Sequence, residues 1–167
     1  MTKIWKDTGF VENDNWALPA DGEPLPAGVR PILPLGEFLE QMEASNEGGF
    51  GVLIAPADDV AKLAPHLERI ALVALSFPAF NDGRAFSHAS LLRARLGYQG
   101  EVRAVGDVLI DQIPLMIRCG IDSFAVTNAT AIRRLSEGRL PGISLHSQPA
   151  FKAADAQQGY SWRRKAS

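Results

Sequence analysis

The sequence predicts an α/β protein built on an open, mostly parallel sheet of four to five strands with flanking helices. From residue 50 onward, apolar runs alternate with stretches of helical spacing. The runs are apolar at consecutive positions, which is typical of strands covered on both faces by helices. Right-handed crossovers make such strands parallel. Half of a (β/α)8 barrel fits the same alternation and is the alternative, because a complete barrel needs about 250 residues and the chain has 167.

The first 35 residues form an extended N-terminal arm in this prediction. They are rich in Pro, Gly, Asp and Asn and show no helical period. Short strands are expected at "KIW" (3–5) and "GFVE" (9–12), joined by a turn at residues 7–9. "RPILPL" (30–35) is a further extended piece. Its prolines favour an edge position or no strand at all, because proline cannot donate to a ladder.

A single domain spans residues 1–167, with a repeated β-α core at 50–148 and a tail at 150–167. Asp58, Asp82 and Asn128 precede predicted helices as N-caps, and Asp107 begins another. The predicted strands cover residues 50–55, 70–77, 101–106, 122–126 and, as a fifth, 142–147. The predicted helices cover residues 36–45, 59–70, 83–97, 107–120 and 129–138.

The composition limits the expected partners and location. The net charge is -2, so no strong field draws the chain to nucleic acid or to an anionic membrane. No apolar run approaches the roughly 20 residues of a membrane span, and the first ten residues lack the apolar core of a secretory signal. We therefore expect no nucleic-acid partner, no membrane association and a cytoplasmic location.

The sequence indicates no metal site and leaves the cofactor unknown. Cys119 is the one cysteine, so the chain cannot form an internal disulfide or a thiolate cluster. His66, His88 and His146 are far apart and show no metal-ligand spacing. No glycine-rich dinucleotide motif and no Walker loop follows a predicted strand.

The carboxyl ends of the predicted strands are the expected place for a ligand, because parallel α/β sheets bind there. Several polar residues follow those ends, and three of them (Asp58, Asp82 and Asn128) also suit a purely structural role as helix caps. The polar residues of this predicted rim are Asp58, Asn81, Asp82, Arg84, Asp107, Asp111, Gln112, Thr127 and Asn128.

Arg84 is the least expected residue of the rim. It falls in the first turn of a predicted helix, where the helix dipole disfavours a cation. An anion should offset it, either Asp82 or Asp107 in an ion pair or a bound anion. Asp107 and Asp111 lie four residues apart and would share a helix face. Arg84, Asp107 and Asp111 are thus expected to form a cluster that serves either as a structural network or as a ligand site.

Four stretches of residues 77–126 carry a resemblance: "FNDGRAFS" (80–87), "LLRARLGY" (91–98), "GEVRAVGDVLIDQ" (100–112) and "RCGIDSFAV" (118–126). They resemble a bacterial family of unknown function that carries the label of an oxidoreductase of sulfite reduction. The label rests largely on gene neighbourhood, so the resemblance implies a pathway, assimilatory sulfite and sulfate reduction toward cysteine, rather than a reaction. The matching polar positions are Asn81, Asp82, Gly83, Arg84, Ser87, Asp107, Asp111 and Gln112.

Three functional hypotheses follow. The first is an accessory protein that docks on sulfite reductase or its electron donor. The second is an enzyme in which Asp107 or Asp111 acts as acid or base, while Asn81, Asp82, Arg84, Ser87 and Gln112 bind a small oxyanion such as sulfite. The third is a non-catalytic regulatory or structural module, with a homodimer that completes a half-barrel as one form.

Overall fold

The protein folds around one curled sheet of eight strands in the order β2-β1-β8-β7-β6-β5-β4-β3. The computed structural model describes residues 2–6, 9–19, 25–79 and 81–141. The neighbouring pairs from β3 to β8 are parallel, and β1 and β2 are antiparallel additions beside β8. The strands are β1 (Lys3–Lys6), β2 (Gly9–Phe10), β3 (Trp16–Ala17), β4 (Arg30–Pro34), β5 (Phe50–Ile54), β6 (Ile70–Phe77), β7 (Glu101–Gly106) and β8 (Ser123–Val126).

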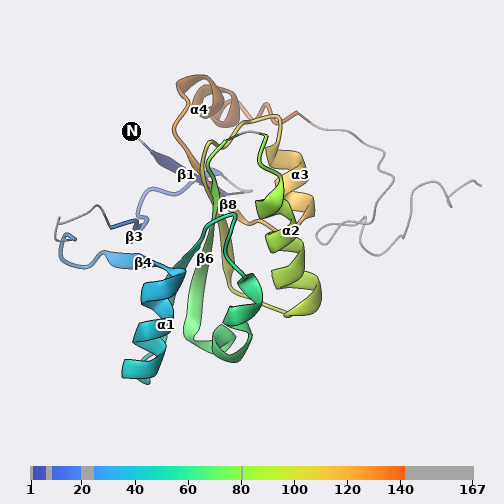
Figure 1. Ribbon diagram of the computed structural model, residues 1–167. Coiled ribbons are helices and arrows are strands. Elements are labelled where there is room, and N and C mark those ends of the chain that lie inside the picture. The colour runs from blue at the N-terminus through green and yellow to red at the C-terminus, as the bar shows by residue number, and fades with distance from the viewer. Residues whose placement is uncertain (1, 7–8, 20–24, 80, 142–167) are drawn as a thin grey trace, which may run out of the picture.

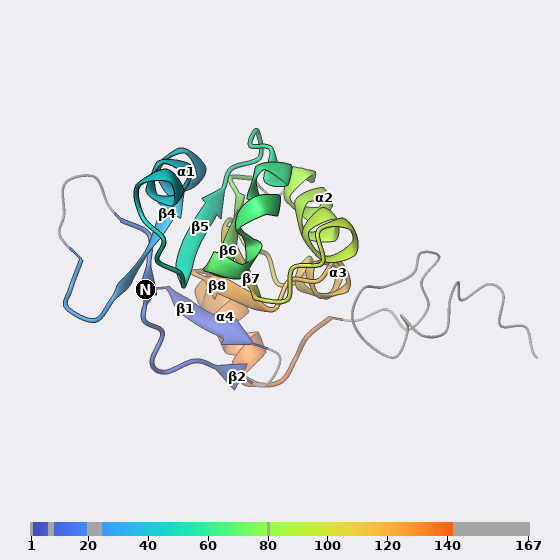
Figure 2. The same ribbon diagram turned by 90° about the horizontal axis from the view of Figure 1, so that it is seen from below.

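The helices lie along the outer side of the curled sheet (Figures 1 and 2). Because β4 to β8 follow one another in sequence as well as in space, right-handed crossovers place every connecting helix on the same face. The arrangement is therefore a half-barrel with one helical layer. The helices are α1 (Leu35–Ala44), the 3₁₀ helix η1 (Val60–Arg69), α2 (Arg84–Ser90), the π-helix η2 (Leu91–Arg95), α3 (Ile113–Arg118) and α4 (Ala129–Ser136).

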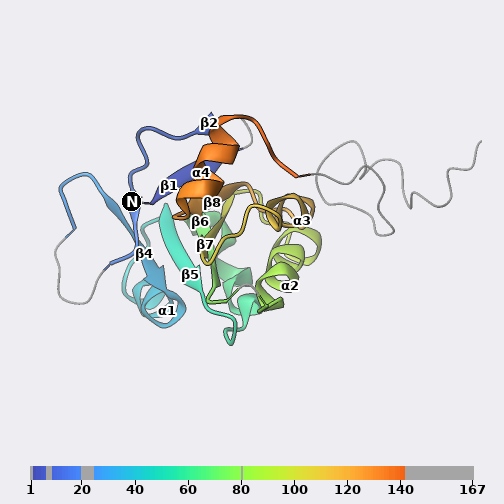
Figure 3. The ribbon, with the colours of Figure 1, turned by 90° about the horizontal axis from the view of Figure 1, so that it is seen from above.

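The curl follows from the path of residues 11–15, which we call the strap. The strap joins β2 to β3, and these are the two edge strands of the sheet. Six residue steps from Phe10 to Trp16 reach at most about 21 Å, whereas the edges of a flat eight-stranded sheet lie about 34 Å apart. The sheet must therefore bend so that its edges approach, and the strap crosses the concave side (Figure 3).

Both faces of the sheet are buried, as the apolar runs predicted, but different parts of the chain cover them. The helices and the convex face enclose the larger core, which includes Phe38, Phe77 and Phe124. The concave face carries a smaller cluster built on Leu72 and Ala74, against which Trp16 packs. The N-terminal arm thus takes the place of the second helical layer expected for an open sheet.

The structure corrects three expectations about individual elements. The sheet has eight strands rather than four or five. Residues 30–34 are not an edge strand, because β4 pairs with β5 on one side and with β3 on the other. Each proline is tolerated because it pairs on one side only: Pro31 faces Ala17 of β3 before the pairing with β5 begins, and Pro34 faces Leu53 of β5 beyond the pairing with β3. The helix expected over residues 107–120 begins only at Ile113, after an irregular loop. The strand expected at 142–147 and the tail lie outside the described residues.

Candidate functional site

Arg84 and Asp82 form a local ion pair at the carboxyl edge of the sheet. The guanidinium donates from Nη2 to Asp82 Oδ2 over 2.7 Å and from Nε to Asp82 Oδ1 over 3.0 Å. The same Oδ1 accepts from the Arg84 backbone N–H. The Arg84 side chain is 60% exposed. The hydrogen bond from Arg84 lowers the pKa of the Asp82 carboxyl. The anion expected beside Arg84 is therefore Asp82, which already occupies two of its donors.

Asp107 and Asp111 do not join this pair. No hydrogen bond or ion pair links either carboxylate to Arg84 in the described part of the chain, and both residues are exposed. Both lie in the loop before α3, so the expected helical spacing between them does not apply. Gly106 explains the turn into this loop: its φ is +97°, and a Cβ there would come within 2.4 Å of the Phe77 carbonyl oxygen. The Asp107 N–H donates to that same oxygen over 2.7 Å.

Two of the remaining rim residues, Asn128 and Asp58, hydrogen-bond to the local backbone. Asn128 caps α4 as predicted, since its side chain accepts from the N–H groups of Thr130 and Ala131. The cap of η1 is Asp59 rather than Asp58, which instead accepts from the Ala55 N–H over 2.7 Å. Asn81 and Thr127 are exposed, Gln112 precedes α3, and Ser87 is exposed on α2.

Two of the phenylalanines around the rim, Phe77 and Phe86, belong to the core. Phe77 is buried at the end of β6, and its ring meets that of Phe86 edge-on at a centroid distance of 5.3 Å. The Phe77 side chain points to the helical layer, and Phe86 holds the first turn of α2 against it. The described part of residues 77–86 is thus a packed strand-to-helix connection that carries the ion pair of the exposed Arg84 with the half-buried Asp82.

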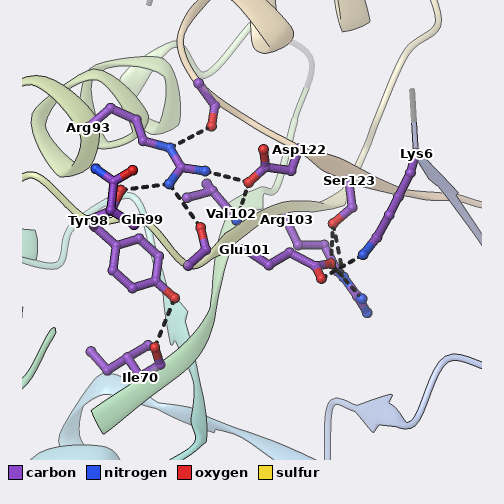
Figure 4. Close-up of polar contacts among 12 residues, drawn as sticks. Lys6, Ile70, Arg93, Tyr98, Gln99, Glu101, Val102, Arg103, Asp122 and Ser123 are labelled. Atoms are coloured by element: carbon purple, nitrogen blue, oxygen red, sulfur yellow. Dashed lines mark hydrogen bonds and ion pairs between the residues drawn. The ribbon is translucent and has the colours of Figure 1, made fainter. Parts of the chain in front are cut away.

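The most extensive polar network lies at the other end of the strands, on the concave face (Figure 4). Arg103 on β7 is 2% exposed and donates to Asp14 of the strap through two nitrogens, over 2.7 and 2.8 Å. It also donates to Glu101 over 2.9 Å. Glu101 accepts further hydrogen bonds from Lys6 over 2.8 Å and from Ser123 over 2.6 Å. This network fastens β1, β7, β8 and the strap to one another.

A second buried arginine fastens the convex side (Figure 4). Arg93 is 6% exposed and donates to the carbonyl oxygens of Gly120, Tyr98 and Gly100 over 2.9, 2.7 and 2.9 Å. It also forms an ion pair with Asp122, whose carboxylate accepts from the Val102 N–H. The wide turn of η2 places Arg93 inward, so the π-helix has a structural explanation here.

Glu101 makes the stability of the fold depend on pH. Burial raises the pKa of its carboxyl, but hydrogen bonds from Lys6, Ser123 and Arg103 bring the net pKa below the ordinary 4.5. The stabilisation from such a group is complete above about pH 4.5 and is lost as the pH falls through the folded-state pKa. We expect Glu101→Gln to unfold more easily at neutral pH and to lose less stability on acidification than the wild type in urea titrations. Glu12→Gln, at an exposed strap residue, is the control, and equal acid losses in Glu101→Gln and wild type would contradict the prediction.

Neither Arg84 nor Asp82 lines either of two surface cavities among the described residues. One of about 600 Å³ lies between β1, β2 and the strap, with Lys3, Glu12 and Trp16 in its walls. The other, of about 440 Å³, is a groove on the outer side of the helical layer. Its lining residues are Phe86, Ser87, Ser90, Leu91, Ala94, Arg95 and Cys119. Of the residues predicted for the site, Ser87 alone lines one of these two cavities.

The described residues contain no group of three or more His, Cys, Asp or Glu side chains placed to hold a metal ion. None of the helices among them is of a length and hydropathy that would cross a membrane. Cys119 follows α3, and burial raises the pKa of its thiol, while a hydrogen bond with Ser90 acts in the opposite direction.

The comparison with protein families gives a match over residues 51–157 to the family described as "Bacterial protein of unknown function (DUF934)". The matched segment covers more than half of the 167 residues. The chain belongs to this family. No curated protein and no solved structure matches the chain. The DUF934 match includes the predicted rim, Arg93 and Arg103, whereas Asp14 and the strap lie before it. The family description states no reaction, ligand or partner.

Proposed function

We propose that this DUF934 protein is an accessory component of assimilatory sulfite and sulfate reduction, and that it docks on sulfite reductase or its electron donor. The resemblance of residues 80–112 to the family with the sulfite-reduction label supports the pathway. One observation favours an accessory role: Cys119 is the only cysteine in the chain, and burial raises the pKa of its thiol. A raised pKa lowers the thiolate fraction at neutral pH, so this residue is a poor thiol nucleophile. In the proposal, the partner protein carries the electrons.

The enzyme hypothesis receives less support from the rim. An oxyanion at Arg84 would have to compete with Asp82, which accepts two hydrogen bonds from the guanidinium side chain. Asp107 and Asp111 stand apart from that pair on an exposed loop. A small anion remains part of the proposal only as a ligand that displaces Asp82 from Arg84. A homodimer that completes a half-barrel would need to accommodate the strap, which joins the edge strands β2 and β3 across the concave side.

A deletion strain and a pull-down test the accessory role. We expect the deletion strain to grow slowly with sulfate as the sulfur source and normally with cysteine. The tagged full-length protein should recover sulfite reductase or its electron donor from sulfate-grown cells. Normal growth of the deletion strain on sulfate, together with no sulfur-assimilation enzyme in the pull-down, would contradict the proposal.

Arg84→Ala separates the accessory role from catalysis at the rim. Because the Arg84 side chain is 60% exposed and its ion pair is local, we expect the variant to keep the melting temperature of the wild type within experimental error. We also expect it to restore growth of the deletion strain on sulfate. Asp107→Asn should behave in the same way, since Asp107 is exposed. A stable Arg84→Ala or Asp107→Asn variant that fails to restore growth would favour the enzyme hypothesis instead.

A further inference from the structure

The groove on the helical layer has the form of a helix-binding surface. One wall follows successive turns of α2 and η2, with Phe86, Ser90 and Ala94 on one row and Ser87, Leu91 and Arg95 on the next. From residue 86 to residue 95 this wall extends about 14 Å at roughly 1.5 Å per residue. That length matches two to three turns of a bound helix.

Cys119 lines the groove, and the helix just before it, α3, carries an apolar side chain that the fold leaves exposed. Leu115 on α3 is 51% exposed, although its neighbours Ile113 and Met116 are fully buried. Leu115 lies four residues before Cys119, so it stands one turn along the same side of α3 as the groove-lining cysteine. Leu115 therefore extends the apolar surface of the groove outward, toward solvent.

The charge on the groove is positive. Arg95 is the one charged residue among those that line it, and Arg95 is exposed. Since the whole chain has a net charge of -2, this arginine marks a local departure from the overall sign. A carboxylate on a bound segment would pair with it, whereas a basic segment would be repelled.

We propose that this groove receives an amphipathic helix of the sulfite reductase or of its electron donor, with apolar side chains at three- and four-residue spacing and a carboxylate opposite Arg95. The inference rests on the proposed accessory function and adds the surface through which the protein docks. Apolar anchors at this spacing are the usual way in which a helix occupies a groove. A contact of two to three turns is small, which suits a transient complex.

Binding of purified full-length protein to purified sulfite reductase, and separately to its electron donor, tests the groove. We expect Leu115→Glu and Arg95→Glu each to raise the dissociation constant about tenfold or more. The matched controls are Leu18→Glu, at the other exposed large apolar residue of the described chain (45% exposed), and Arg134→Glu, at an exposed arginine of α4. Both controls should bind like the wild type.

Alkylation of Cys119 supplies a second readout, because it is the only cysteine in the chain and lines the groove. Mass spectrometry of the Cys119 peptide should show that alkylation slows in proportion to the fraction of protein bound to the partner. In isolated protein, the rate should be independent of concentration and unchanged in Leu18→Glu.

The outcomes separate the two proposals. If the wild type binds neither partner protein, the accessory role fails and the groove inference fails with it. If the wild type binds while Leu115→Glu and Arg95→Glu bind equally well and Cys119 stays open to alkylation, the groove inference is wrong and the accessory role stands. If the rate of Cys119 alkylation in isolated protein falls as the protein concentration rises, a second copy occupies the groove. If alkylation is faster in isolated Leu115→Glu than in isolated wild type, the chain itself covers the groove. Either result would overturn the inference.

Discussion

Arg93→Met is expected to lower the free energy of unfolding by about 3–5 kcal/mol, because it breaks a buried ion pair and removes the guanidinium donors from several acceptors. The variant loses hydrogen bonds to three backbone carbonyls and the ion pair with Asp122. Methionine keeps much of the side-chain volume, so the loss reports on the polar contacts. Since domains of ordinary stability unfold at about 5–15 kcal/mol, the effect is a large share of the total.

Urea denaturation followed by circular dichroism measures this change. Arg95→Met is the matched control, because Arg95 lies on the same π-helix and is exposed. We expect the control to stay within about 0.5 kcal/mol of the wild type. A loss below about 1 kcal/mol in Arg93→Met would mean that the buried network is not a major source of stability.

Asp14→Ala is expected to release the strap and to lower the free energy of unfolding by about 2–4 kcal/mol. The substitution removes both charge-assisted hydrogen bonds from Asp14 to the buried Arg103. Arg103 keeps Glu101 as a partner, so the effect should be smaller than that of Arg93→Met. Amide hydrogen exchange should rise at residues 11–17 before it rises in β6 and β7.

Glu12→Ala is the control for Asp14→Ala, since Glu12 belongs to the same strap and is exposed. Its urea midpoint and its exchange rates should match those of the wild type. If Asp14→Ala leaves exchange at residues 11–17 unchanged, then the packing of Trp16 on the concave face, rather than the ion pair, holds the strap.

The repeated β-α pattern could be predicted from the sequence because each strand and helix has a local signal. The four central strands and the Asn128 cap follow from apolar runs and from cap chemistry near in sequence. The eight-stranded, curled sheet could not be predicted, because β3 has only two residues and pairs with residues 14 positions further along the chain. The half-barrel was the alternative prediction. The consecutive order of β4 to β8 in the sheet supports it over a sheet with helices on both faces.

The residues of the predicted rim show how far a functional site could be predicted from the sequence. Arg84 pairs with an aspartate as expected, but its partner is Asp82, the nearest one in sequence. A side chain two residues away can reach Asp82 without any tertiary contact. The larger networks around Arg93 and Arg103 join residues up to 95 positions apart. Arg103 within an apolar strand was the one local signal of the concave network. Nothing near Asp14 in the sequence indicates that it is the partner.

The pairing of β1 with β8 sets the order in which parts of the protein can fold during synthesis. Lys3 leaves the ribosome well before its strand partner Val126, which is made 123 residues later. Until then Arg103 and the concave face have no cover from the arm. The parallel core from β5 onward can assemble as it emerges, but the arm must wait and then return across almost the full chain. Contacts of such long sequence separation form slowly. The newly made protein therefore passes through a stage in which its core is present while its inner face is still open to chaperones.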